Sequence, residues 1–258
     1  MRTLMEVKKL KSGYKVFFDD DTESILIEQD IYFKFHLKPG LTIDEKTYQK
    51  MVSENNELFY MRLGILKLKR MQTEKELYTY LVEKGCSKSL ALKLISYYKD
   101  KKYLNDEEYA KIYVEFKKHQ QGPSLLKSNL EKKGIDQDIV NQAIQKVDQE
   151  EILEKLILKK ISTNKNKTKK QLYITTKTYF LSKGFQNDLI DSLLNQAMND
   201  LKFDETDLLN KTFDQIYHKL KDKKSGYELK ALIKQKLYQK GFSLTDIENI
   251  FIDKDVLS

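Results

Sequence analysis

Apolar residues recur three or four positions apart through most of the chain, and this spacing predicts helices. Four of the helical patterns end in the same pair, which we call the Lys-Gly turns: Lys84-Gly85, Lys133-Gly134, Lys183-Gly184 and Lys240-Gly241. A glycine in the left-handed conformation commonly ends a helix, and a lysine in the last turn faces the negative end of the helix dipole. The four turns therefore predict helix ends spaced about 50 residues apart, as in repeat proteins.

A second helix is predicted after each Lys-Gly turn, because a capping residue and a new apolar stripe follow it. The expected caps are Ser87, Asp136, Asn187 and Ser243 or Thr245. A third helix is predicted in the first three units, and each begins among acids: Asn105-Asp106-Glu107-Glu108, Asp148-Gln149-Glu150-Glu151 and Asp204-Glu205-Thr206-Asp207. Carboxylates in a first turn favour a helix start. We therefore interpret them as start signals and not as a metal or catalytic site.

The N-terminal region has a different pattern. The sequence predicts a short antiparallel sheet there, with strands at Met5 to Lys11, Tyr14 to Phe18 and Ser24 to Glu28 and with Ser12-Gly13 as the first turn. Asp19, Asp20 and Asp21 lack the glycine of a calcium loop, so a polar hairpin turn is the better interpretation. A helical pattern from about Ile43 to Arg70 leads into the repeats.

The predicted fold is mainly α: tandem three-helix repeats of about 50 residues each form an elongated curved array, preceded by a small antiparallel β extension. The expected boundaries are a β-rich extension at 1–42, a connecting helix at 43–70, repeats at 71–120, 121–160 and 161–221, and a partial fourth repeat at 222–258.

Composition excludes several classes of protein. Nine glycines and two prolines are few for a sandwich or barrel, and no apolar run is long enough for a membrane span or a signal peptide, so a soluble cytoplasmic protein is expected. Cys86 is the single cysteine, and the three histidines are far apart without ligand spacing. No cofactor or metal is expected. Because no P-loop or nucleophile motif is present either, a non-enzyme is expected.

The net charge of +8 indicates an anionic partner, with solvated lysine-rich helix faces as the alternative. The chain has three arginines, Arg2, Arg62 and Arg70, so lysine supplies nearly all of its positive charge. Arginine is the usual reader of guanine edges, whereas lysine acts as a point charge on phosphate or carboxylate. Sequence-specific DNA recognition is therefore disfavoured, and contact with a nucleic-acid backbone or an acidic protein is favoured.

The segment from Tyr103 to Ile135, YLNDEEYAKIYVEFKKHQQGPSLLKSNLEKKGI, closely resembles the RecX family of recombinase modulators. The family pattern combines an aromatic-Leu-acid cluster, an aromatic-Ala pair, a glycine about a dozen residues later and a Leu-x-x-Lys-Gly end. Its matching positions are Tyr103, Leu104, Asp106, Glu107, Tyr109, Ala110, Gly122, Leu130, Lys133, Gly134 and Ile135, and Gly184 and Gly241 are similar to the later repeats. The family often has a basic residue soon after the first glycine. Here Pro123 to Leu126 stand there and Lys127 follows, so a specific basic contact at that point does not carry over.

The resemblance implies a function that composition does not. RecX proteins bind RecA filaments on single-stranded DNA and limit filament growth, recombinase activity and ATP hydrolysis in recombination and repair. RecA is thus the expected partner and inhibition the expected effect, for a monomeric protein without membrane contact. Single- or double-stranded DNA is a further expected partner, bound without sequence specificity. The alternatives are a DNA-binding architectural protein that acts without RecA, and a scaffold for an unrelated protein.

Lysines beside the unit junctions are the candidate partner or nucleic-acid contacts: Lys117, Lys118, Lys127, Lys132, Lys133, Lys165, Lys167, Lys169 and Lys170. Plain surface exposure is the alternative for each of them. Five tyrosines form a sector that could stack on bases but, at helical spacing, is more typical of a core: Tyr97, Tyr98, Tyr103, Tyr109 and Tyr113.

Overall fold

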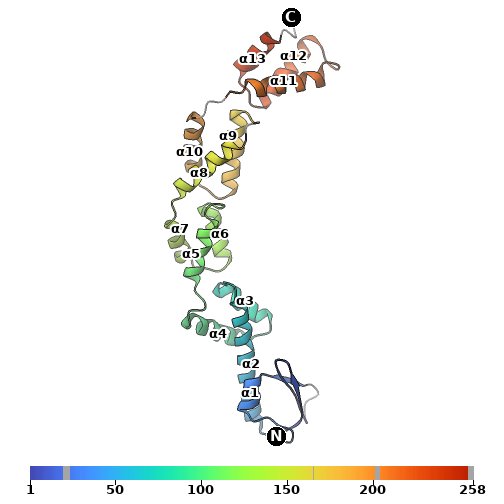
Figure 1. Ribbon diagram of the computed structural model, residues 1–258, viewed down its shortest axis with the longest axis vertical. Coiled ribbons are helices and arrows are strands. Elements are labelled where there is room, and N and C mark those ends of the chain that lie inside the picture. The colour runs from blue at the N-terminus through green and yellow to red at the C-terminus, as the bar shows by residue number, and fades with distance from the viewer. Residues whose placement is uncertain (20–23, 165, 201–203, 255–258) are drawn as a thin grey trace. The chain divides into compact units, whose positions relative to one another are not determined.

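The computed structural model describes residues 1–19, 24–164, 166–200 and 204–254. It is mainly helical, with a small N-terminal sheet, and the predicted fold class of tandem three-helix units is confirmed (Figure 1). Two compact units are present: residues 1–109 with 133–136, and residues 110–132 with 137–258.

The N-terminal sheet has four antiparallel strands in the order β3-β2-β1-β4. Their bounds are β1 Arg2–Leu10, β2 Gly13–Phe18, β3 Ile25–Ile27 and β4 Thr42–Ile43. The three predicted strands are confirmed, whereas β4 and the short helix α1 (Gln29–Lys34) were not predicted. Gly13 has φ 136°, and a Cβ there would lie 2.5 Å from the Ile27 carbonyl oxygen, so the turn requires glycine. Asp20 and Asp21 lie outside the described residues.

Helix α2 (Glu45–Lys67) joins the sheet to the first helical bundle. The Asp44 side chain caps it by accepting a hydrogen bond from the Thr47 amide at 2.7 Å. Tyr48 and Met51 belong to the core beneath the sheet, while Tyr60 and Met61 pack against the next core. The helix predicted from about Ile43 to Arg70 is confirmed, but it begins at Glu45 and ends at Lys67. Ile43 belongs to β4.

The Lys-Gly turns end helices as predicted. The glycines have φ of 91°, 84°, 85° and 94° in chain order. The helices that they follow are α3 Glu74–Glu83, α6 Pro123–Lys132, α9 Lys169–Ser182 and α12 Gly226–Gln239. In three of the turns the amide of the residue after the glycine bonds back to the carbonyl five residues earlier: Cys86 to Leu81 at 3.0 Å, Phe185 to Phe180 at 3.2 Å and Phe242 to Leu237 at 3.3 Å. This bond folds the apolar residue after the glycine onto the helix.

The second helices follow directly: α4 Lys88–Asp100, α7 Gln137–Gln145, α10 Asn187–Asp200 and α13 Leu244–Asp253. Ser87 and Ser243 cap them as predicted, accepting from the amides of Leu90 and Asp246. The prediction for Asn187 was wrong by one residue. Asn187 is already helical, and its side-chain amide donates to the Asp191 carboxylate at 3.2 Å.

The third helices are α5 Asp106–Lys117, α8 Gln149–Ser162 and α11 Thr206–Leu220. Asn105 and Asp148 cap the first two, each accepting from the amide three residues later at 3.0 Å. Asp204 was expected to cap the last one, but Glu205 holds the cap position without a side-chain cap bond. Asp204 instead accepts from the Thr206 amide at 3.0 Å. Phe203, aligned with Leu104 in the sequence pattern, lies outside the described residues.

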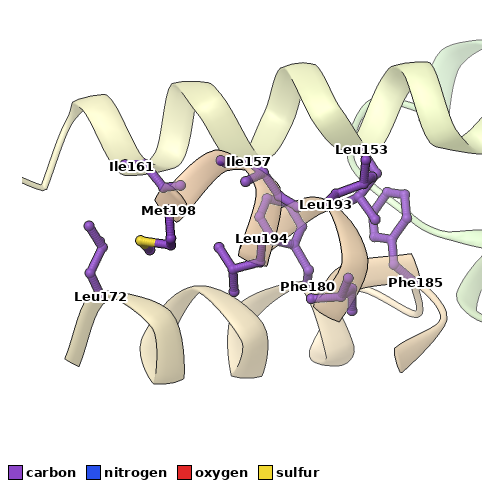
Figure 2. Packing of buried hydrophobic residues seen from close by; sticks show 11 residues of the cluster. Leu153, Ile157, Ile161, Leu172, Phe180, Phe185, Leu193, Leu194 and Met198 are labelled. Atoms are coloured by element: carbon purple, nitrogen blue, oxygen red, sulfur yellow. The ribbon is translucent and has the colours of Figure 1, made fainter. Parts of the chain in front are cut away.

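The third helices α8 and α11 each pack with the pair of helices that follows them. Leu153, Ile157 and Ile161 of α8 share one core with residues of α9 and α10 (Figure 2). Leu209, Phe213 and Ile216 of α11 share another with α12 and α13. The bundles α8-α9-α10 and α11-α12-α13 are therefore offset by one helix from the predicted frame of 121–160, 161–221 and 222–258. Helices α12 and α13 thus belong to a full bundle.

The offset has a physical reason. A repeat period states how often a helix type returns, but not which three consecutive helices share a core. That choice is made by the apolar stripe of the third helix, and in α8 this stripe faces α9 and α10.

Candidate partner interface at the Lys-Gly turns

The Lys-Gly turns are held by hydrogen bonds from residues that precede them in the chain. In each turn the lysine carbonyl accepts a hydrogen bond from a residue outside its own helix, which fixes the backbone of the turn. The four donors are Tyr60 Oη to Lys84 at 3.3 Å, Thr73 Oγ1 to Lys133 at 2.7 Å, the Gly122 amide to Lys183 at 2.7 Å and Thr168 Oγ1 to Lys240 at 2.9 Å.

Gly122 and Gly184 allow two backbone segments to approach each other directly. The Gly122 amide bonds to Lys183, and the Ser124 amide bonds to the Gly184 carbonyl at 3.1 Å. A Cβ on Gly122 would collide with the backbone of Gly184 and Phe185, and a Cβ on Gly184 would lie 2.5 Å from the Leu125 amide nitrogen. The N-terminus of α6 and the end of α9 thus meet backbone to backbone.

The acids that open two third helices also bind the first helices. Asp106 Oδ1 accepts from the Glu74 amide at the start of α3 at 3.0 Å. Glu205 Oε1 accepts from the Lys169 amide at the start of α9. Helix α6 begins with Pro123, which has no amide hydrogen to donate at the corresponding position. The acid clusters are therefore structural, as the sequence pattern indicated.

Burial raises the pKa of Asp106 above its ordinary value, although the hydrogen bond from Glu74 opposes this shift. Lys133 lies nearby in the same unit, paired with Glu76 and 5.4 Å from the centroid of the Tyr109 ring. Desolvation lowers the pKa of Lys133, but hydrogen bonds with Glu76 and Tyr109 outweigh it, and the net shift is upward. Lys133 thus stays charged but has an internal partner.

Several of the candidate lysines have protein partners. Lys118 pairs with Glu115 at 2.6 Å, and Lys127 lies 3.9 Å from Glu131. Lys167 Nζ donates to Thr175 Oγ1 at 3.1 Å. Lys117 is half-buried and Lys132 is exposed, while Lys165 lies outside the described residues. Their role as partner contacts stays a prediction.

Lys169 and Lys170 line a hollow of about 820 Å³ in the second unit. Asp204, Glu205 and Asp246 line it as well, so its charge is mixed. The Lys170 ammonium also lies 5.5 Å from the centroid of the Tyr238 ring. This hollow is a weaker candidate for a polyanion than a surface of lysine alone.

The five-tyrosine sector divides between core and surface. Tyr98 is fully buried, its hydroxyl donates to the Met61 carbonyl at 2.6 Å, and burial raises its pKa to about 12. Tyr109 and Tyr113 are half-buried, whereas Tyr103 is 62% exposed. The core interpretation is right for Tyr98, and the sector does not form one stacking platform of exposed rings.

Sequence reasoning missed the tyrosines five residues before two of the glycines. Tyr179 has the ammonium groups of Lys160 and Lys183 at 4.0 and 5.4 Å from its ring centroid. Tyr80 has Lys67 and Lys84 at 4.8 and 5.9 Å. The repeated position of the two tyrosines relative to glycine was the available signal.

Comparison with known proteins places the chain in a family. A family model described as "RecX, second three-helix domain" matches residues 105–144, which span α5, α6 and α7. The regulatory protein RecX of Bacillus subtilis is 30% identical over 262 residues, covering 96% of both chains. The regulatory protein RecX of Streptococcus uberis is 26% identical, covering 95% of this chain and 98% of the relative.

Solved structures agree in fold. A crystal structure of regulatory protein RecX has a TM-score of 0.57 at 19% identity and covers 76% of this chain and 100% of its own. The crystal structure of RecX from Lactobacillus salivarius has a TM-score of 0.52 at 25% identity and covers 56% and 97%.

The fold and the Lys-Gly turns define a tandem three-helix-bundle protein with a lysine-rich surface. The family match and the relatives identify it further: the chain belongs to the RecX family of regulatory proteins. No helix in the described part of the chain is long and apolar enough to cross a membrane. Within the described residues, no group of His, Cys, Asp or Glu side chains could hold a metal ion.

Proposed function

We propose that this chain binds RecA filaments on single-stranded DNA and inhibits their growth, so that recombinase activity and ATP hydrolysis fall in recombination and DNA repair. Family membership carries this proposal, since relatives named as regulatory protein RecX align along about 95% of the chain. In this proposal the chain acts by binding and not by catalysis, and it works as a soluble cytoplasmic monomer.

The repeated bundles support a filament as the partner. A filament presents the same surface many times, and a chain of similar bundles can place similar contacts on successive subunits. Linked contacts add through their effective concentration, so individually weak contacts suffice. Lysines at the Lys-Gly turns, including Lys133 and Lys183, are proposed as part of this interface, together with Lys117, Lys118, Lys127, Lys132, Lys165, Lys167, Lys169 and Lys170.

The test is an ATPase assay with RecA from the same organism on single-stranded DNA. At substoichiometric amounts of this protein, we expect ATP hydrolysis to fall, and to fall further when the protein is added before the filament forms. No change in hydrolysis at physiological salt would refute the proposal.

A DNA-binding architectural protein that acts without RecA is the second candidate. The lysines around Tyr179 favour it, because no carboxylate pairs with Lys160 or Lys183 among the described residues. Titration of single- and double-stranded DNA at two salt concentrations separates the two functions. Tight, salt-dependent DNA binding without an effect on RecA would favour this candidate.

A further inference from the structure

Tyr179 and two lysines form a compact cationic cluster in the second unit. Lys160 lies near the end of α8, and Lys183 is the C-cap residue of α9. Their ammonium groups lie 4.0 and 5.4 Å from the centroid of the Tyr179 ring, which is 39% exposed. A ring of this kind attracts ammonium groups and restricts their positions. The two positive charges are thus held close together at the surface.

The charge of this cluster is not neutralised internally. Among the described residues, no carboxylate forms an ion pair with Lys160, with Lys183 or with the adjacent Lys159. Other lysines of the same two helices do have such partners: Lys155 of α8 pairs with Glu151, and Lys177 of α9 pairs with Asp191 at 2.7 Å. The difference lies in the placement of acids, and it leaves a positive site at one end of the bundle.

A cavity of about 250 Å³ opens at this cluster, lined by Lys159, Lys160, Lys183, Tyr179, His119 and Thr163 among others. Among the residues that the structure describes, no Asp or Glu side chain lines it. Ammonium and hydroxyl groups are hydrogen-bond donors, and lysine binds phosphate as a point charge. The cavity therefore suits a small, strongly hydrogen-bond-accepting anion such as a phosphate group.

The same arrangement occurs a second time, in the first unit. Tyr80 has the ammonium of Lys67, the last residue of α2, at 4.8 Å and that of Lys84 at 5.9 Å. In both clusters one lysine comes from the end of a preceding helix, the other from a Lys-Gly turn, and the tyrosine lies five residues before the glycine. Asn129 and Lys236 occupy this position in the other two repeats, so those turns lack the ring.

We propose that the two clusters, Lys160-Tyr179-Lys183 and Lys67-Tyr80-Lys84, are binding sites for the phosphates of a nucleic-acid strand. A nucleic acid carries phosphates at regular intervals, and each cluster by itself offers two lysine charges to phosphates of such a strand. Both clusters contain lysines and no arginine, which suits contact with the nucleic-acid backbone and not recognition of the base edges. The proposal goes beyond RecA regulation, because it requires no RecA.

The test measures binding of the full chain to a fluorescently labelled oligothymidylate by anisotropy over a series of KCl concentrations. The test variant is Lys160→Gln with Lys183→Gln, and the matched control is Lys155→Gln with Lys177→Gln. Both remove two lysine charges from α8 and the α9 segment, but the control lysines are held in ion pairs. Thermal melting first verifies that both variants are folded.

The slope of log K against log salt is negative, and each phosphate contact with a single strand contributes about 0.7 to its magnitude. Because the test variant loses two contacts, we expect the magnitude of its slope to decrease by about 1.4. The control should keep the wild-type slope. Tyr179→Phe should bind as wild type and Tyr179→Ala more weakly. Lys67→Gln with Lys84→Gln should lower the slope by a similar amount, which provides an independent second test.

Two results would overturn the proposal: a wild-type chain that does not bind the oligonucleotide, or equal slopes in the test and control variants. If the test variant loses inhibition of RecA but keeps oligonucleotide binding, the clusters contact protein and not nucleic acid. Conversely, the test variant could bind the oligonucleotide with a weaker salt dependence and still inhibit RecA. That result would support the phosphate sites without contradicting the proposed RecA function, so the two proposals can fail separately.

Discussion

Asp106 accepts a hydrogen bond from the backbone amide of Glu74, 3.0 Å away and 32 residues earlier in the chain. The carboxylate at the start of α5 thereby binds the N-terminus of α3, where the helix dipole is positive. In the second unit, Glu205 and the Lys169 amide form the equivalent pair. One acid thus connects the starts of two helices that are separated in sequence.

Replacing Asp106 tests this connection. Asp106→Ala should lower the free energy of unfolding by about 1 kcal/mol, because the Glu74 amide loses its acceptor. Asp106→Asn keeps an acceptor oxygen and should lose less. Glu107→Ala, at the exposed neighbouring acid, is the control and should change little. Equal loss in the Ala variants of both positions, measured by thermal or urea unfolding, would contradict the role of Asp106.

The raised pKa of Asp106 also predicts a pH dependence. Its cause is burial, which disfavours the charged form in the folded state. Protonation therefore favours folding, and this contribution is present at low pH and lost as pH rises through the folded-state pKa. Compared with Asp106→Asn, the wild type should gain stability as pH falls towards 4. A difference between the two that is constant from pH 7 to pH 4 would show that the shift is absent.

The buried threonine caps should be among the most sensitive polar positions. Thr168 is 1% exposed, accepts from the Gln171 amide at 3.2 Å and donates to the Lys240 carbonyl at 2.9 Å. Thr168→Val removes both bonds at nearly equal volume and should cost about 1–3 kcal/mol. Thr178→Val is the matched control on the same helix, because Thr178 is exposed and bonds only within α9. Its cost should stay within about 0.5 kcal/mol.

Comparing Gly184→Ala with Gly226→Ala separates the cost of backbone strain from the cost of a steric clash. Gly184 has φ 85°, and an added Cβ would lie 2.5 Å from the Leu125 amide nitrogen, so the loss should reach about 2–4 kcal/mol. Gly226 has φ 52° in the same unit but nothing within 4 Å of its Cβ position. Gly226→Ala should therefore cost only the conformational term, about 1 kcal/mol. Similar losses for both variants in urea unfolding would mean that the contact with α6 does not contribute.

Cys86 should be unreactive in the folded protein. It is 4% exposed, and burial raises the pKa of its thiol. The thiolate is the reactive form, so labelling by a disulfide reagent at pH 8 should be at least about tenfold slower in the native protein than in urea. Equal rates in both conditions would show that the first bundle opens readily around this residue.

The features that the sequence predicted are local ones. The Lys-Gly turns, the caps at Ser87 and Asp148 and the apolar stripes each depend on residues within one or two helical turns. The bundle frame was not predictable in this way, because it depends on which neighbours the stripe of α8 meets. The contact of Asp106 with Glu74 could not be predicted either, since any of three adjacent acids could have made it.

The candidate site shows the same limit. The candidate lysines were chosen because they lie beside the unit junctions in the sequence, but Lys118 and Lys133 have acidic partners in the structure. Lys160 and Lys183 were overlooked, since lysines at helix ends ordinarily complement the helix dipole. Only the structure shows that both lie against Tyr179 without a carboxylate partner among the described residues. The sequence therefore indicated a lysine-rich surface, whereas choosing among its lysines requires the positions of the acids in the structure.

RecA filament growth on labelled single-stranded DNA, followed in the presence of this protein, tests the central claim most directly. The protein is added at a small fraction of the RecA concentration, and the control is the same amount of Thr168→Val protein heated above its melting temperature. We predict that growth slows or stops at substoichiometric ratios and that pre-formed filaments lose ATP hydrolysis. Unchanged filament growth at equimolar protein and physiological salt would contradict the proposed function.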